Sequence, residues 1–354
     1  MSRFFSSDYA ALTPYTPGEQ PRIENLIKLN TNESPFPPSP HAMEYAREAT
    51  KTLQLYSDPT ANALHAALAA RLGVSSDEVL ATNGSDEILN FAFMAFCDRE
   101  HGAAFADLTY GFYPVFAQLN GIPYTEIPVA EDFSIRPQDY FGLEKTIFLA
   151  NPNAPTGLFL PKSDVVRILE ENRDSVVVVD EAYVDFGGES CVDLIHSYDN
   201  LLVTQTFSKS RSMAGARLGF GVGCRALIRD LNTIKYSTNP YNVNTMTMAA
   251  GIGALEDEAY TRANCAAIIE NRAYAAAELR GLGFDMTDSK TNFLFARHSV
   301  LDGETVYREL RARGILVRHF SLARIRDYNR ITVGSRTQME ALVAALREIV
   351  GGNV

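Results

Sequence analysis

The chain has 354 residues, of which 46% are hydrophobic and 21% charged, a composition typical of a soluble globular protein with room for two domains. The formal net charge of −11 comes without a basic run, which excludes most nucleic-acid binders but not an anionic substrate held by a few arginines. The longest apolar runs reach about half of the roughly 20 residues of a membrane span, and the first residues lack an apolar signal core, so we expect a cytoplasmic protein.

Between about residues 42 and 236, short β-rich runs alternate with amphipathic segments, which predicts a mostly parallel sheet covered by helices on both faces. We expect strands over residues 78–82, 103–107, 145–150, 175–179 and 201–204, and helices over residues 85–97 and 162–171. Several of these strands are apolar on both faces, as buried parallel strands are. The pattern predicts a large α/β domain over residues 41–256.

After residue 256 the regular alternation of expected strands and helices ends. We expect helices over residues 246–256, 260–279, 303–312 and 337–349, and strands over residues 292–296, 315–318 and 330–333. These elements predict a smaller α+β domain over residues 257–354. The proline-rich opening, with four prolines between residues 35 and 40, predicts an extended arm without a core of its own; we assign residues 1–40 to the smaller domain.

Lys209 is the residue around which the chemistry gathers. It stands in Thr206-Phe207-Ser208-Lys209, and Arg217 follows eight positions later. A lysine that must lose its proton to form an imine needs a partly desolvated site with other cations nearby. Hydroxyl groups and an arginine suit a phosphate. A lone lysine is usually a surface residue, but these neighbours favour a functional one.

Asp180 ends the run of four valines at residues 176–179, and Tyr183 follows it. A carboxylate at the end of a buried strand costs free energy unless a cation pairs with it, and a protonated pyridine nitrogen is such a cation. A helix-capping aspartate is the alternative. Together with the phosphate seat beside Lys209, Asp180 predicts a pyridoxal phosphate pocket.

Other candidate residues have weaker signals. Ser85 and Asp86 follow Gly84 at a helix start, where backbone amides favour anions, although an ordinary helix cap explains them too. Tyr110 follows a strand at the sheet edge where ligands bind, and the alternative is a packing role. Asn153 lies in a turn that offers amide groups, or that is simply rigid.

Arg318 and Arg330 stand in expected strands, where a charge needs a partner. A carboxylate or phosphate of a ligand would satisfy them, and a structural ion pair is the alternative, more so for Arg318 than for Arg330. The six histidines and four cysteines show no ligand spacing, so we expect no metal and reduced thiols.

Taken in order, these motifs make the chain resemble the fold-type I pyridoxal phosphate-dependent aminotransferases over nearly its whole length, and most closely the histidinol-phosphate aminotransferases. The N-terminal signatures are Leu12-Thr13-Pro14-Tyr15, Leu29-Asn30-Thr31-Asn32-Glu33 and Tyr56-Ser57-Asp58. The later ones are Gly84-Ser85-Asp86-Glu87, Thr109-Tyr110-Gly111, Asp180-Glu181-Ala182-Tyr183, Ser208-Lys209 with Arg217, and Arg330-Ile331-Thr332-Val333-Gly334.

The resemblance implies a role for each matched residue. Lys209 would hold the cofactor covalently and move the catalytic proton, Asp180 would bind the ring nitrogen, and Tyr183 the ring 3-oxygen. Tyr110 would stack on the ring, and Tyr56 would reach the phosphate in the other subunit of a homodimer. The phosphate cradle would comprise Ser85, Asp86, Thr206, Ser208 and Arg217. The substrate would meet Tyr15, Asn32, Arg318 and Arg330.

Ala154 departs from the family pattern, in which an asparagine before Pro-Thr-Gly binds the ring oxygen. We expect Asn153 to substitute for it as a cofactor contact.

The resemblance implies ping-pong transamination between histidinol phosphate and 2-oxoglutarate. The alternatives are an aromatic or broad-range aminotransferase, and an enzyme resembling the threonine-phosphate decarboxylase. A cofactor-bound regulatory protein without turnover is the alternative from another class.

Overall fold

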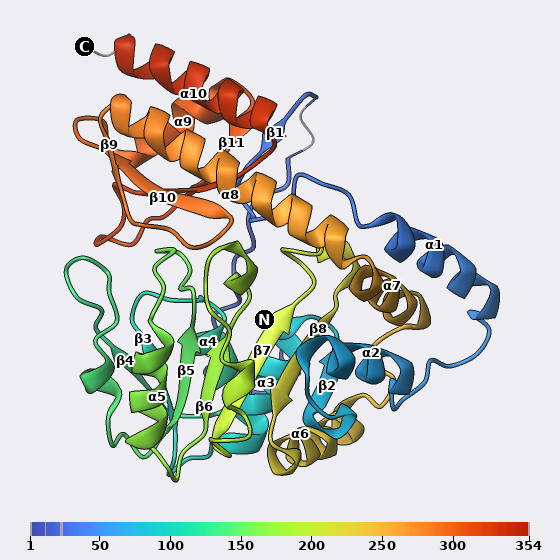
Figure 1. The fold of residues 1–354 in the computed structure, drawn as a ribbon. Coiled ribbons are helices and arrows are strands. Elements are labelled where there is room, and N and C mark those ends of the chain that lie inside the picture. Colours follow the sequence, from blue (N-terminus) through green and yellow to red (C-terminus); the bar gives the residue numbers. More distant parts are fainter. Residues whose placement is uncertain (1, 11, 22–23, 353–354) are drawn as a thin grey trace.

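A seven-stranded sheet forms the centre of the larger part of the computed structural model, which describes residues 2–10, 12–21 and 24–352 (Figure 1). The strand order is β2 (Val79–Thr82), β8 (Gly219–Gly223), β7 (Leu201–Thr206), β6 (Val177–Asp180), β5 (Thr146–Ala150), β3 (Ala103–Ala106) and β4 (Tyr124–Ile127). β8 runs antiparallel to both of its neighbours, β2 and β7, and the other adjacent pairs are parallel. The predicted parallel sheet is therefore confirmed.

Helices cover both faces of this sheet, because alternate residues of each strand point to opposite sides. Val177 and Val179 join one buried cluster, and Val178 joins the other. The first cluster receives side chains from α2 (Asn62–Leu72), α5 (Lys162–Glu170) and α7 (Thr245–Glu256). The second receives side chains from α3 (Ser85–Phe96), α4 (Tyr113–Asn120) and α6 (Arg225–Thr238). Each fully buried valine or leucine contributes roughly 1.5–3 kcal/mol to this packing.

The smaller part of the chain is built on a four-stranded antiparallel sheet. Its order is β12 (Arg318–His319), β13 (Asn329–Thr332), β10 (Phe293–His298) and β9 (Phe284–Met286). The helices α8 (Glu258–Gly281), α9 (Gly303–Ala312) and α10 (Arg336–Gly351) pack on it, and in Figure 1 α8 extends from this part toward α7. The smaller α+β unit expected from the sequence is thus present.

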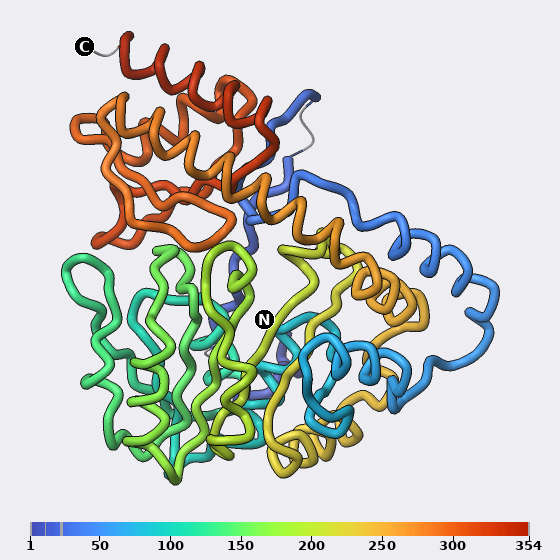
Figure 2. The backbone as a smooth tube through the Cα atoms, in the orientation of Figure 1, coloured from blue at the N-terminus to red at the C-terminus, as the bar shows by residue number. Residues whose placement is uncertain are grey.

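The N-terminal segment joins the smaller part. The strand β1 (Ile27–Lys28) pairs in parallel with β11 (Ile315–Leu316), and Leu29 packs in the core of the smaller part. Figure 2 shows this blue segment passing between the orange-red and green parts of the chain. It therefore lies where it can reach the carboxyl edge of the large sheet.

Two expectations need correction. The predicted strand over residues 315–318 is two strands, because β11 pairs with β1 while β12 pairs with β13. The proline-rich opening is not extended to its end, since Pro40 begins α1 (Pro40–Ala49) at the first helical position, where proline is favoured, and Ser39 caps that helix. The domain boundaries at residues 41 and 257 stay a prediction. In the part of the chain that the structure describes, no helix is long and apolar enough to cross a membrane.

Candidate active site

Two adjoining cavities lie at the carboxyl edge of the large sheet. The first, of about 480 Å³, is lined by Ala150, Asp180 and Thr206, the last residues of β5, β6 and β7. The second, of about 470 Å³, reaches toward the smaller sheet. Thr31, Tyr110, Ala154, Tyr183 and Lys209 line both. Open α/β sheets bind ligands at this edge, and Lys209 stands where the two cavities meet.

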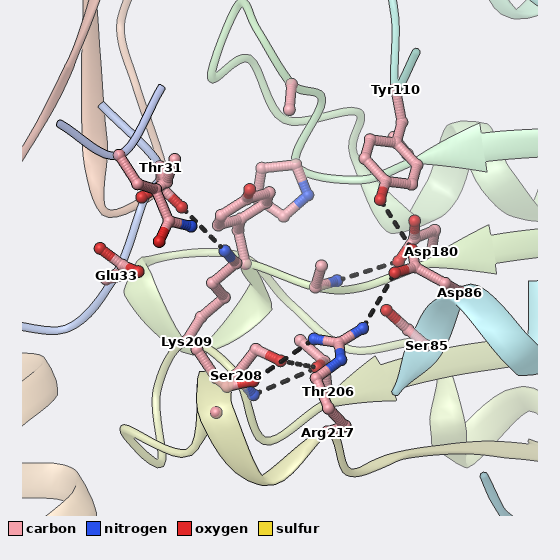
Figure 3. Close-up of a pocket in the computed structure, with 18 residues that line it drawn as sticks. Thr31, Glu33, Ser85, Asp86, Tyr110, Asp180, Thr206, Ser208, Lys209 and Arg217 are labelled. Atoms are coloured by element: carbon pink, nitrogen blue, oxygen red, sulfur yellow. Dashed lines mark hydrogen bonds and ion pairs between the residues drawn. The ribbon is translucent and has the colours of Figure 1, made fainter. Parts of the chain in front are cut away.

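The pKa of the Lys209 ammonium is lower than that of an ordinary lysine. Its Nζ donates to the Thr31 carbonyl oxygen at 3.3 Å (Figure 3). Burial, and secondly the positive charge of Arg330, lower the pKa of Lys209 to about 8, against the opposing effect of Glu33. A lysine with this pKa supplies an appreciable neutral amine at neutral pH, which is the nucleophilic form.

Asp180 is a buried carboxylate without a cation. It is 5% exposed and accepts hydrogen bonds from the Tyr113 hydroxyl at 3.2 Å, the Thr204 hydroxyl at 3.3 Å and the Ala182 amide at 3.3 Å. Burial raises the pKa of Asp180 to about 6. No basic side chain among the described residues forms an ion pair with it. A protonated aromatic nitrogen in the cavity would supply the missing charge, so the pyridine of pyridoxal phosphate fits here.

The phosphate seat predicted from the sequence is assembled at the start of α3. Gly84, at φ +80°, precedes Ser85 and Asp86, and a Cβ at Gly84 would lie 2.6 Å from Arg217 Nη2. The Thr206 hydroxyl donates to the Ser208 hydroxyl at 3.0 Å, and Arg217 pairs with Asp86 at 3.0 Å (Figure 3). Helix-start amides, hydroxyl groups and a guanidinium converge on one wall, which is the chemistry of a phosphate site.

Asn32 fixes the orientation of the Tyr183 hydroxyl. The backbone N–H of Asn32 donates to Thr332 Oγ1 at 2.9 Å. The Thr332 hydroxyl in turn donates to Asn32 Oδ1 at 3.2 Å. This leaves the Asn32 side-chain amide to donate to the Tyr183 oxygen at 2.8 Å. Because the Tyr183 oxygen is the acceptor there, its own proton is free for an acceptor in the cavity.

Tyr110 and Tyr15 complete the walls of the cavities. The Tyr110 hydroxyl donates to Asp86 at 2.7 Å, which holds its ring beside the phosphate seat. Tyr15 lines the second cavity, with its ring 4.3 Å from that of Phe112 between centroids.

Asn153 lies away from the cavity lining, and its expected contact with the cofactor stays a prediction. Its side-chain amide donates to the Leu108 carbonyl at 2.9 Å and to Thr156 at 3.1 Å, and its oxygen accepts from Thr109 at 2.7 Å. Asn153 lies outside both cavities, while Ala154 lines both. The printed hydrogen bonds of the Asn153 side chain thus tie its turn to the segment that follows β3.

Arg318 and Arg330 lie side by side as Cα partners in β12 and β13. Arg330 donates to the Asn30 carbonyl at 3.2 Å, but its Nε is buried without a partner. Among the described residues, the Arg318 guanidinium makes one long hydrogen bond, at 3.4 Å, to the Thr16 carbonyl, and it lies over the Phe320 ring. Neither forms an ion pair with a described residue. Two unpaired guanidinium groups on the second cavity are suited to an anion.

Tyr56 lies outside both cavities of its own chain. It is 84% exposed and stacks on Tyr241 with ring centroids 4.7 Å apart. Its expected contact with the other subunit's cofactor stays a prediction.

Several residues at the site were missed by sequence reasoning. Thr31, Glu33, Tyr113 and Thr204 contact Lys209 or Asp180, or adjoin them electrostatically. Thr31 and Glu33 belong to the recognised Asn30–Glu33 signature, which was a usable signal. Tyr113 gave none, because its role depends on the packing of α4 beside β6.

Comparisons with known proteins agree on one family. The family model for aminotransferase class I and II matches residues 24–346. Histidinol-phosphate aminotransferase 2 of Dechloromonas aromatica is 50% identical over 99% of this chain and 100% of its own length. Histidinol-phosphate aminotransferase of Aromatoleum aromaticum is 48% identical, again over 99% and 100%.

A solved structure repeats the fold. The histidinol-phosphate aminotransferase of Sinorhizobium meliloti, in complex with pyridoxal-5'-phosphate, has a TM-score of 0.90 at 23% identity and covers 100% of this chain and 99% of that one.

Proposed function

This chain belongs to the class I and II aminotransferases, and from that membership we propose that it transfers an amino group between histidinol phosphate and 2-oxoglutarate with pyridoxal phosphate. The observation that carries the proposal concerns Arg318 and Arg330. These two arginines lie side by side on the cavity that adjoins Lys209, and neither forms an ion pair with a described residue. The relatives at 48–50% identity over their full length carry the name of this activity.

The cofactor is proposed on the fit of the first cavity. When bound, pyridoxal phosphate supplies an electron sink for the charge that develops at the substrate's Cα. Asp180 would keep a ring nitrogen protonated, and Tyr183 would donate to a ring oxygen. The phosphate is assigned to Ser85, Asp86, Thr206, Ser208 and Arg217. The ring is assigned to the face of Tyr110.

Lys209 is assigned the covalent hold on the cofactor and the transfer of the substrate's Cα proton. Its lowered pKa keeps it available as a base at neutral pH. Thr31 fixes the Nζ position through its carbonyl. The substrate's anionic end is assigned to Arg330, Arg318 and Tyr15, so one pair of arginines would receive both the phosphate of one substrate and the carboxylate of the other.

The proposed function is tested by adding L-histidinol phosphate to the purified holoenzyme and recording its visible absorbance. Loss of the bound-cofactor band, and its return with 2-oxoglutarate, would support the proposal. An unchanged band would reject this substrate and direct the test to aromatic amino acids. Release of carbon dioxide from threonine phosphate would identify the decarboxylase alternative.

Replacing Arg330 with methionine is expected to lower kcat/KM for histidinol phosphate about 10- to 150-fold, because charged hydrogen bonds contribute roughly 1.5–3 kcal/mol. With L-histidinol, which lacks the phosphate, the same change should alter kcat/KM by less than about threefold. Steady-state kinetics on both substrates measures the difference. Arg297→Met, on the neighbouring strand and outside both cavities, is the matched control. An equal loss on both substrates would contradict the anion-binding role.

Asn32→Asp is expected to weaken cofactor binding about tenfold, since an aspartate would accept the Tyr183 proton and withdraw it from the cavity. Equilibrium dialysis of pyridoxal phosphate measures the change. In the Tyr183→Phe background the same substitution should have little further effect, as expected of residues that act through one another. Additive effects in that double-mutant cycle would sink the proposed arrangement.

We further propose that the enzyme is a cytoplasmic homodimer in which Tyr56 of each subunit completes the other's phosphate site. The exposure of Tyr56 and its position outside its own cavities support this assignment.

A further inference from the structure

The loop of residues 56–60, which carries Tyr56, is held by a second segment of the same chain. We call these the Tyr56 loop and the supporting segment, residues 235–244. The Tyr56 ring stacks on Tyr241 at 4.7 Å and an interplanar angle of 23°. The Pro59 carbonyl accepts hydrogen bonds from Lys235 Nζ and, at 3.3 Å, from the Tyr236 hydroxyl. The supporting segment thus holds the exposed Tyr56 ring in position.

Burial of Lys235 beneath the Tyr56 loop costs free energy, because a charged side chain loses its contact with water. Lys235 is 2% exposed, and burial lowers its pKa. It forms no ion pair with a described residue, and its contacts are the Pro59 carbonyl and the face of Tyr236 at 4.8 Å. A buried cation that binds one loop carbonyl is a device for fixing the position of that loop.

The supporting segment is also tied to the phosphate seat. Glu87, in the first turn of α3, accepts from the Asn83 amide at 2.7 Å and from the Asn242 side chain at 2.5 Å through the same oxygen. Asn83 begins the turn that leads into Ser85 and Asp86. A contiguous series of contacts therefore runs from this chain's phosphate turn through Glu87 and Asn242 to Tyr241 and Tyr56.

We propose that Tyr241 and Asn242 are positioning residues for the partner subunit's cofactor phosphate, which they serve by fixing Tyr56. This inference rests on the proposed homodimer. Neither residue lines the two adjoining cavities of its own chain, so we expect their effect to fall on the other subunit. Loss of Asn242 leaves the bond between Glu87 and Asn83, and the chain's own phosphate turn keeps its shape.

Mixed dimers separate the two subunits. One subunit carries Lys209→Ala, so borohydride can trap pyridoxal phosphate only on Lys209 of the other. Mass spectrometry then counts the trapped cofactor as its concentration is varied. We place Tyr241→Ala or Asn242→Ala on the Lys209→Ala subunit. The cofactor concentration at which half of the Lys209 side chains are trapped should then rise about five- to tenfold. On the Lys209-bearing subunit, the same changes should shift it by less than about twofold. Equal effects in both placements would overturn the proposal.

Two variants complete the test. Tyr241→Phe keeps the ring and should behave as the wild type, whereas a loss there would exclude stacking as the cause. Tyr56→Phe, placed on the Lys209→Ala subunit, tests the homodimer itself: no effect would reject the cross-subunit contact. An effect of Tyr56→Phe with none from Tyr241→Ala would leave the function standing and overturn this inference. Faster hydrogen exchange of residues 56–60 in cofactor-free Tyr241→Ala is the expected independent sign.

Discussion

Replacing Lys209 with alanine is expected to reduce transamination by a factor of at least about 10³, since positioned proton transfer alone contributes roughly 10²–10⁴. The same change removes the covalent hold on the cofactor. Single-turnover absorbance measures the first effect, and borohydride trapping the second. Lys290→Ala, at a half-buried lysine outside both cavities, is the control. Activity within tenfold of the wild type would refute the role of Lys209.

The pKa of Lys209 gives this experiment a second arm. In the cofactor-free protein its pKa is lowered from 10.5 to about 8, so its neutral fraction rises most steeply around pH 8 and changes little above about pH 9. The rate of cofactor attachment should follow that curve. A rate that continues to rise up to about pH 10 would be the behaviour of an ordinary exposed lysine and would contradict the desolvated site.

Asp180→Asn is expected to have opposite effects on activity and on stability. It removes the charge that would hold a ring nitrogen protonated, and turnover should fall at least about 10²-fold, as expected for loss of a buried charge pair that costs roughly 3–5 kcal/mol. In the cofactor-free protein, the same change should raise the free energy of unfolding at pH 8 by up to about 3 kcal/mol, because Asp180 is a carboxylate ionised without a cation.

The sign follows from the direction of the shift. Burial raises the folded-state pKa of Asp180 from 3.8 to about 6. Its destabilising effect is fully present above pH 6 and disappears as the pH falls below 3.8, so the gain of Asp180→Asn should shrink across that window. Urea unfolding at several pH values measures it. Glu181→Gln, a neighbouring buried carboxylate outside both cavities, is the control that should retain turnover. A pH-independent gain would contradict the argument.

Much of the large sheet could be predicted because most of its strands can be recognised from their own residues. The valines of β6 are apolar on both faces, and that pattern belongs to a central parallel strand. The strand β8 was not predicted, since it contains three glycines, which are poor strand formers. Its sequence is dictated by contact with another element: a Cβ at Gly219 would lie 2.4 Å from the Ser85 nitrogen. Such a constraint cannot be read from β8 alone.

The site shows the same division. Lys209, Asp180 and the phosphate seat were placed together from motifs, and the structure gathers them on one cavity. The sequence suggested that Arg318 and Arg330 lie in strands, but only strand register makes them neighbours. The partners of the Asn153 side chain at Leu108 and Thr109 could not be predicted either, because they lie more than 40 residues away in the chain.

The link between Asn32 and Thr332 joins residues 300 positions apart, and it governs when the protein becomes competent during synthesis. At roughly 5–20 residues per second, a ribosome needs about 15–60 s to make the chain between them. Until residues 315–316 are made, β1 lacks its partner strand, and Leu29 lacks part of its core. The nascent large sheet can already be complete, yet Thr31 and Asn32 cannot yet be held by the smaller sheet. Synthesis of the smaller sheet, and not the assembly of the sheet that precedes Lys209, therefore sets the earliest moment at which the substrate cavity can exist.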